Sequence, residues 1–237
     1  MRTYPPTPVS ASCPSDWAAR YALSGATADR NATALVAKRA LDVLAAGLLL
    51  VGLAPVLLLL ALAVRISSPG PALFRQQRVG CDGRRFSFYK FRTMYYGADE
   101  SPHRVYYQQL VNGTARPIGR SYKLEDDPRV TPVGRVLRRY SLDELPQLVN
   151  VLLGDMSLVG PRPPIPYEVE FYGARELHRL SVKPGLTGLW QVSGRSTLSF
   201  QEMIELDLSY VARWSLTYDL LILLRTPWAV ISGTGAC

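Results

Sequence analysis

The longest apolar run of the chain extends from Val43 to Val64, 22 residues with no charged side chain. A helix of this length can cross a bilayer. Lys38 and Arg39 precede the run and Arg65 follows it, although the positive-inside rule places basic residues mainly at the cytoplasmic end of a span. Pro55, near the middle, removes a helix hydrogen bond. Two interpretations stay open: a kinked transmembrane helix, or a segment that enters the membrane and returns to the same side.

Short alternating segments follow the apolar run. Phe74–Val79 and Arg85–Phe91 flank Cys81-Asp-Gly83, a turn sequence, and predict a β-hairpin. Residues 95–130 are polar and turn-rich, which indicates a helix with loops. Helical spacing of apolar residues then predicts four helices. They are Pro132–Arg139, Leu145–Leu153, Tyr167–Arg179 and Phe200–Trp214.

Two features of the C-terminal part concern pairing and membrane contact. Asp207 falls on the apolar stripe of Phe200–Trp214, and a carboxylate in that position favours an ion pair with an arginine. The segment Leu220–Ile231 is apolar but too short to span a bilayer. It is typical of an interfacial helix, with anchoring aromatic side chains at the headgroup level. The candidate anchors are Trp214, Tyr218 and Trp228.

Charge and cysteine content narrow the partners. The formal net charge of +8 favours an anionic partner, such as phosphates, nucleic acid or an acidic lipid surface. Between Arg65 and Arg92 there are seven basic residues and one acid. Such a basic face is suited to bind phosphates, but it can also be an ordinary solvated surface. The sequence does not decide between these two interpretations. Three scattered cysteines indicate a reducing compartment. The two histidines lack the spacing of metal ligands, so any bound metal is expected to be held by carboxylates.

The stretch from Ser141 to Gln147 places Asp143 and Glu144 side by side. Ser141 and Glu144 have the spacing of a capping box, which would make them only a helix start. Pro146, however, fits best as the third residue of a helix, which predicts a helix beginning at Asp143. Carboxylates at such an end can also act chemically. An ionised aspartate can attack phosphorus, and an adjacent carboxylate can hold Mg²⁺.

Several ordered motifs resemble the bacterial sugar transferase family, the monotopic polyprenyl-phosphate phosphoglycosyl transferases. The resemblance covers about Lys38 to the C-terminus. The motifs are Lys90-Phe-Arg-Thr-Met94, Asp127-Pro-Arg-Val-Thr131, Ser141-Leu-Asp-Glu-Leu-Pro-Gln147 with Asn150, Gly154-Asp-Met-Ser157, Val159-Gly-Pro-Arg-Pro163, Lys183-Pro-Gly-Leu-Thr-Gly188 and Trp190-Gln-Val-Ser-Gly-Arg195.

The resemblance implies an α+β fold. It comprises a mostly helical cytosolic domain with a small β-hairpin, a re-entrant membrane helix and interfacial amphipathic helices. The expected boundaries are residues 1–33 for a disordered tail, 34–66 for a re-entrant helix broken at Pro55, and 67–237 for the catalytic domain. The expected location is the inner membrane of a bacterium, with the catalytic domain facing the cytoplasm.

The resemblance also implies residue roles. Asp143 is expected to be the nucleophile and Glu144 its partner, with Mg²⁺ held by both. The expected substrate contacts are Lys90, Arg92, Arg162, Gln191 and Arg195. For Arg162 and Arg195, structural pairing with Asp155 or Asp207 is the alternative, and for Lys90 and Arg92 it is contact with lipid headgroups.

The implied reaction transfers a sugar 1-phosphate from a UDP-sugar to undecaprenyl phosphate and releases UMP, the first membrane step of polysaccharide assembly. A homodimer is compatible with this activity, and nucleic acid is not expected because aromatic residues do not alternate with the basic ones. The sequence Gly188-Leu-Trp-Gln-Val-Ser-Gly-Arg195 is similar to that of larger exopolysaccharide-type members, which carry an N-terminal region with several membrane spans. The chain is expected to resemble their catalytic module alone. Cys237 departs from the aromatic C-terminus common in the family. A basic scaffold without activity and a polytopic transferase are the rival interpretations.

Overall fold

A computed structural model describes residues 32–99, 101–112, 114 and 127–232 of the chain. The predicted tail therefore lies outside the described residues except for Ala32 and Thr33, as do most of the polar segment 113–126 and Cys237. The elements are α2 (Ala32–Gly52), α3 (Ala54–Ser67), β1 (Leu73–Val79), η1 (Cys81–Gly83), β2 (Arg85–Phe91), α4 (Ser101–Val111), α5 (Pro132–Arg139), η2 (Leu142–Glu144), α6 (Gln147–Leu153), β3 (Ser157–Val159), α7 (Pro166–Val169), α8 (Ala174–Leu177), η3 (His178–Ser181), β4 (Gly185–Thr187), α9 (Leu189–Ser193), η4 (Arg195–Thr197), α10 (Phe200–Arg213) and α11 (Leu216–Ile231).

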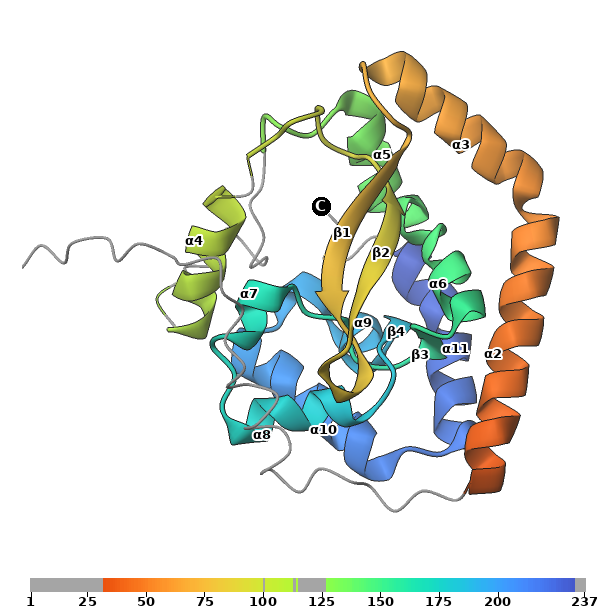
Figure 1. Ribbon diagram of the computed structural model, residues 1–237, viewed down its shortest axis with the longest axis vertical. Helices are drawn as coiled ribbons and strands as arrows, with labels where there is room; N and C mark the ends of the chain where they lie inside the picture. Colours follow the sequence, from red (N-terminus) through yellow and green to blue (C-terminus); the bar gives the residue numbers. More distant parts are fainter. Residues whose placement is uncertain (1–31, 100, 113, 115–126, 233–237) are drawn as a thin grey trace, which may run out of the picture.

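The predicted hairpin is confirmed. Strands β1 and β2 pair antiparallel from Leu73–Phe91 to Val79–Arg85. Since side chains alternate between the two faces of a strand, Arg78 and Lys90 share one face with Phe86 and Phe88, which are buried. The hairpin thus carries two cations on its inner face, and it crosses the middle of the molecule in Figure 1.

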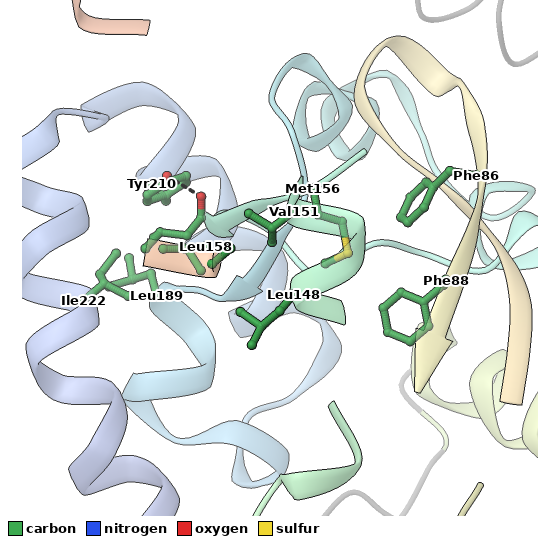
Figure 2. Close-up of a cluster of buried hydrophobic side chains, with 11 residues drawn as sticks. Phe86, Phe88, Leu148, Val151, Met156, Leu158, Leu189, Tyr210 and Ile222 are labelled. Atoms are coloured by element: carbon green, nitrogen blue, oxygen red, sulfur yellow. Dashed lines mark hydrogen bonds between the residues drawn. The ribbon is translucent and has the colours of Figure 1, made fainter. Parts of the chain in front are cut away.

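The main hydrophobic core lies between the hairpin and the C-terminal helix. Figure 2 shows Phe86 and Phe88 of β2 on one side of this core and Ile222 of α11 on the other. Between them lie side chains of α6 and of a second, two-stranded parallel sheet, β3–β4. The hydroxyl of Tyr210 on α10 lies 3.0 Å from the carbonyl oxygen of Val159 on β3 and 2.7 Å from a carboxylate oxygen of Asp219, and these two acceptors share its one proton. This core sets the position of α6, which follows the candidate acidic pair.

A second core cluster joins α4, α7, α8 and α10. At its edge Asp207 forms the expected ion pair, with Arg179 of η3 at 2.5 Å, and both side chains are buried. The predicted helix Tyr167–Arg179 is wrong as one continuous element. It is divided into α7, α8 and η3, because Gly173 has an extended backbone and begins a new helix whose Glu176 side chain accepts from its N–H.

The apolar run forms two helices joined at Leu53. Among the described residues no single helix is long and apolar enough to cross a membrane. The pair α2–α3 satisfies both criteria together but is bent by 64°, and Figure 1 shows it as an outer edge of the molecule. Pro55 lies in the first turn of α3, where its missing N–H interrupts the hydrogen-bond ladder between the two helices. The predicted break is therefore present.

The first half of α2 is bonded to the rest of the protein. Lys38 pairs with buried Asp219 of α11 at 2.5 Å. The guanidinium of Arg39 donates to the carbonyls of Val151 and Leu152 at the end of α6. Buried Asp42 accepts from the backbone N–H of Leu158 at 3.0 Å. The base of the bent pair is thus held rigidly against α6, β3 and α11.

Beyond that base, α2 and α3 present apolar side chains that nothing in the described chain covers. A shorter row of exposed apolar residues lies on α6 and α11. The most exposed members are Leu48, Val51, Leu58, Leu59, Leu62, Ile66, Leu153, Leu224, Trp228 and Ile231. Trp214 and Tyr218, expected as anchors, instead pack partly buried against the main core. Trp228, 77% exposed, fits the expectation.

Candidate active site

The acidic pair lies in a turn between two helices. Thr131 caps α5 by accepting from the N–H of Gly134, and a Cβ at Gly134 would lie 2.0 Å from the carbonyl oxygen of Thr93. Only glycine allows this approach, which presses α5 against the end of the hairpin. The helix ends at Arg139, and η2 with Asp143 and Glu144 begins after two intervening residues.

Ser141 reverses the chain direction in the left-handed region, with φ 53° and ψ 23°. A non-glycine residue in this conformation costs about 1 kcal/mol or more, and such residues concentrate at functional sites. The Ser141 side chain makes no capping hydrogen bond, so the capping-box interpretation is wrong. The predicted helix start at Asp143 is also wrong, since α6 begins at Gln147, after Pro146. The two acids precede the helix in a single 3₁₀ turn.

Two cations face Asp143, whose side chain is 8% exposed. Burial lowers the pKa of Lys90 on β2 to about 8, and the charge of Asp143 opposes that shift. Burial likewise lowers the pKa of Arg138 on α5, again opposed by Asp143. The Nε of Arg138 donates to the hydroxyl of Thr93 at 2.9 Å. Asp143 is therefore a buried carboxyl group beside the positive charges of Lys90 and Arg138.

Glu144 faces a second pair of cations. Burial, together with the charge of Arg162, lowers the pKa of Arg78 on β1, and Glu144 is among the charges that raise it. Burial lowers the pKa of Arg195, again opposed by Glu144. Arg162 also lowers the pKa of Lys90, which places Arg162 within the same field. Its guanidinium lies 3.7 Å from buried Glu168, not from Asp155 or Asp207, the pairings named as alternatives.

Gln191 and Arg195 lie together on α9 and η4. Arg195 has a positive φ of 52°, and its Nε donates to the carbonyl of Gln191 at 3.3 Å. The side-chain oxygen of Gln191 is buried and has no hydrogen-bond partner among the described residues. The structure thus joins these two candidates to each other and connects Arg195 electrostatically with Glu144. Their contact with substrate stays a prediction.

Arg92 has a different environment. Its terminal nitrogens donate to the carbonyls of Val64, Ser68 and Pro69. These bonds attach the end of α3 to the end of β2. The structure does not bring Arg92 to the acidic pair through any of these contacts, and its substrate role stays a prediction.

Two cations of the site were missed from the sequence. Arg78 could have been found from the hairpin register, because it lies on the same face as Lys90. Arg138 directly precedes the acidic motif, but nothing local indicates that its side chain turns toward Asp143. Asn150 also contributes, since it accepts from the N–H of Tyr89 and donates to the carbonyl of Ser87. It locks α6 to β2 beside Lys90.

The residues fit Mg²⁺ only in company with a phosphorylated substrate. Within the described part of the chain, no three His, Cys, Asp or Glu side chains are grouped as a metal site. Mg²⁺ in phosphoryl-transfer sites is commonly held by one or two carboxylates together with substrate phosphate oxygens. Asp143 and Glu144 supply two adjacent carboxylates, which is sufficient for that arrangement.

Comparison with known proteins gives consistent results. A family profile described as "Bacterial sugar transferase" matches residues 33–233. The chain is 45% identical over 205 residues to "Galactosyl transferase CpsE" of Streptococcus agalactiae, covering 85% of this chain and 44% of that protein. It is 43% identical to "Exopolysaccharide production protein ExoY" of Rhizobium meliloti, covering 85% and 88%. It is 46% identical to "UDP-glucose:undecaprenyl-phosphate glucose-1-phosphate transferase" of Caulobacter vibrioides, covering 84% and 71%. The chain thus spans less than half of CpsE and most of ExoY.

Proposed function

The chain belongs to the bacterial sugar transferase family, and on that premise we propose that it transfers a sugar 1-phosphate from a UDP-sugar to undecaprenyl phosphate and releases UMP. The observation that carries the proposal is Asp143, a buried carboxyl group beside the two cations Lys90 and Arg138, two residues after the strained Ser141. Such a site offers a nucleophile and an environment that stabilises diphosphate charge.

In the first step an Asp143 oxygen attacks the phosphorus that carries the sugar. The bond from this phosphorus to the bridging oxygen breaks, and UMP leaves with the electron pair. In the second step a phosphate oxygen of the polyprenyl phosphate attacks the same phosphorus. Asp143 is released as a carboxylate, and the product is a lipid diphosphosugar. Two displacements replace one difficult step.

The surrounding side chains have electrostatic roles in this scheme. Lys90 and Arg138 place positive charge beside Asp143, where the phosphate that it attacks would bind. Arg162 and Arg195 form the positive field in which the diphosphate binds and the charge on leaving UMP is stabilised, and buried Arg78 lies close to Arg162. Mg²⁺ held by Asp143 and Glu144, when bound, would neutralise diphosphate oxygens.

The bent pair is the proposed membrane element. Its uncovered apolar side chains support insertion into the cytoplasmic leaflet of the inner membrane. The basic residues Lys38 and Arg39 at the start of the pair support a topology with both ends on the cytoplasmic side. The apolar rows of α6 and α11 would rest at the interface. A homodimer stays a prediction, which light scattering of the detergent-solubilised chain would check.

The test is intact mass of the purified chain incubated with UDP-glucose or UDP-galactose and Mg²⁺, without lipid acceptor. We expect a phosphosugar adduct that maps to Asp143, with one UMP released for each adduct. Asp143→Asn should lose the adduct and the activity while keeping its thermal transition. Asp143→Glu displaces the nucleophile, and a misplacement of about 1 Å can cost roughly a hundredfold in rate. No UMP from any UDP-sugar until lipid is added would exclude the covalent scheme.

A further inference from the structure

The segment Gly160–Ile165, called here the proline strap, carries Arg162 between three prolines, Pro161, Pro163 and Pro164. Proline has no N–H and a fixed φ, so the strap cannot be held through hydrogen bonds donated from these positions. Within the described residues, only the two terminal N–H groups donate, from Gly160 to Thr187 and from Ile165 to Glu168, and the residues between them are held through their carbonyls. Four successive carbonyl oxygens, from Pro161 to Pro164, each accept from a different donor.

Two of those donors are backbone N–H groups. Gly185 donates to Pro161 at 2.9 Å, and Val79 donates to Pro164 at 2.9 Å. These bonds attach the two ends of the strap to β4 and to β1. They leave the middle, where Arg162 lies, to be held by side chains.

The middle is held by two buried guanidinium groups. Arg78 Nη1 donates to the carbonyl of Pro163 at 3.0 Å, while its guanidinium lies over the ring of Phe88. Arg179 Nη2 contacts the carbonyl of Arg162 itself at 3.5 Å, a long bond strengthened by the positive charge. Both side chains are more than nine-tenths buried, so neither can relax into water.

Arg179 is in turn fixed by its other nitrogens. Its Nε donates to Asp207 at 2.8 Å and its Nη1 donates to the hydroxyl of Tyr172 at 2.6 Å. The planar guanidinium therefore spans a carboxylate, a phenol and the strap at once, which a lysine ammonium cannot do in the same geometry. The path runs from α10 through Arg179 to the backbone of Arg162.

We propose that Arg78 and Arg179 are positioning residues whose task is to hold the proline strap, so that the Arg162 guanidinium is preorganised toward the diphosphate of the nucleotide sugar. This proposal rests on the proposed function. Arg162 is the strap's one charged side chain, and it remains 40% exposed while its backbone is anchored. A cation fixed in advance stabilises transition-state charge without having to reorder at the moment of reaction.

A purely structural role is the alternative, because a buried ion pair such as Arg179–Asp207 also affects folding. The positioning role and the structural role predict different coupling between substitutions at Arg162 and at Arg179. If Arg179 acts through Arg162, then removing the Arg162 side chain should abolish the effect of changing Arg179. If Arg179 only supports the fold, the fold-reductions in kcat/KM caused by the two single substitutions should multiply in the double variant.

The test is a double-mutant cycle on kcat/KM for UDP-sugar, with the thermal transition of each variant measured alongside. The variants are Arg162→Ala, Arg78→Lys, Arg179→Lys and the two doubles containing Arg162→Ala. Lysine keeps the charge beside Asp207 but loses the bonds to Tyr172 and the strap. We expect each lysine variant to lower kcat/KM by about tenfold or more, and each double to equal Arg162→Ala alone.

Arg175→Gln is the matched control. Arg175 pairs with Glu205 at 2.7 Å, so it also links the α8 region to α10, but the pair is exposed and touches no strap carbonyl. It should leave kcat/KM unchanged. Multiplicative losses in both doubles would overturn the proposal while leaving the proposed function intact. Absence of UMP from the unmodified chain would overturn the proposed function, and the positioning proposal with it.

Discussion

At the scale of single residues, Asp143 and Lys90 form the most informative pair. Asp143 is nearly buried, and Lys90 keeps its charge against a burial that lowers its pKa to about 8. The ammonium is therefore lost as the pH rises through about 8. The lowered pKa also makes the free energy of unfolding depend on pH. Between about pH 8 and 10.5 the unfolded chain binds more protons at Lys90 than the folded chain does. Stability at this group rises over that range.

The pH profile of the reaction tests the role of Lys90. We expect kcat/KM to fall as the pH rises through about 8, because the diphosphate and Asp143 lose their cationic neighbour. In Lys90→Arg the charge persists, so the fall should move to higher pH, and in Lys90→Met the remaining activity should no longer show it. The thermal transition, followed over the same range, separates this effect from unfolding. An identical alkaline fall in all three proteins would assign it to another group.

Magnesium dependence tests Glu144. We expect EDTA to abolish UMP formation and Mg²⁺ to restore it. Glu144→Gln should raise the Mg²⁺ concentration needed for half of the maximal rate, because one of the two carboxylates is lost. Arg195→Gln removes a cation that faces Glu144 and supplies the contrast, since it should raise the KM for UDP-sugar more than the Mg²⁺ requirement. A Glu144→Gln variant with an unchanged Mg²⁺ titration would contradict the assignment.

At the scale of elements, the bend between α2 and α3 is decisive. Its angle of 64° coincides with Pro55 and with Gly52, which ends α2. With an N–H restored at position 55, the helix could continue from α2 into α3. The straight helix would be long and apolar enough to span a bilayer.

Cysteine labelling measures this change in topology. In a background with Cys13, Cys81 and Cys237 replaced by serine, Val36→Cys and Pro71→Cys report the two ends of the bent pair, both exposed. We expect an impermeant maleimide to reach both only from the cytoplasmic side. With Pro55→Ala, a fraction of molecules should label at the two ends from opposite sides. Pro227→Ala, inside α11, is the control and should change nothing. Opposite-side labelling without any proline change would establish a full span.

At the scale of the whole molecule, the bent pair α2–α3 is joined to the rest of the described chain through buried polar contacts. Asp219 accepts from Lys38, from the hydroxyl of Tyr210 and from the indole of Trp214. Figure 1 shows that α2 runs beside α6 and α11, so this contact sets the angle at which the pair leaves the protein. The position of the active site relative to the bilayer depends on that angle.

Loss of Asp219 tests the junction. Asp219→Ala leaves the mostly buried Lys38 ammonium without its carboxylate partner, which should lower the free energy of unfolding measurably, by less than the loss of a partner costs a fully buried charge. Lys38→Met combined with Asp219→Ala should regain part of that loss, because the unpaired charge is gone. Thermal unfolding in detergent micelles measures both. Arg104→Gln, which breaks the exposed pair with Glu170, should change little. Equal thermal stability of Asp219→Ala and the unchanged chain would mean that the contact between Lys38 and Asp219 does not stabilise the protein.

Local patterns determined much of this protein. The alternation in residues 73–91 predicted the hairpin, and helical spacing predicted α5 and α10 closely. The apolar run with Pro55 predicted a broken helix. The adjacent acids and their motif identified Asp143 and Glu144 as the candidate catalytic pair, a role that stays a prediction. Each of these signals depends on residues near in the chain, which is why they can be read without the fold.

The tertiary structure alone decided which charges act together. Of the basic residues between Arg65 and Arg92, Arg78 and Lys90 turn toward the acids and Arg92 turns to the end of α3. The left-handed turn at Ser141 and the late start of α6 at Gln147 also follow from packing, because α5 must approach the hairpin closely. The partner of a buried charge is chosen by distance in space, and residues far apart in sequence, such as Lys38 and Asp219, leave no local mark of that choice.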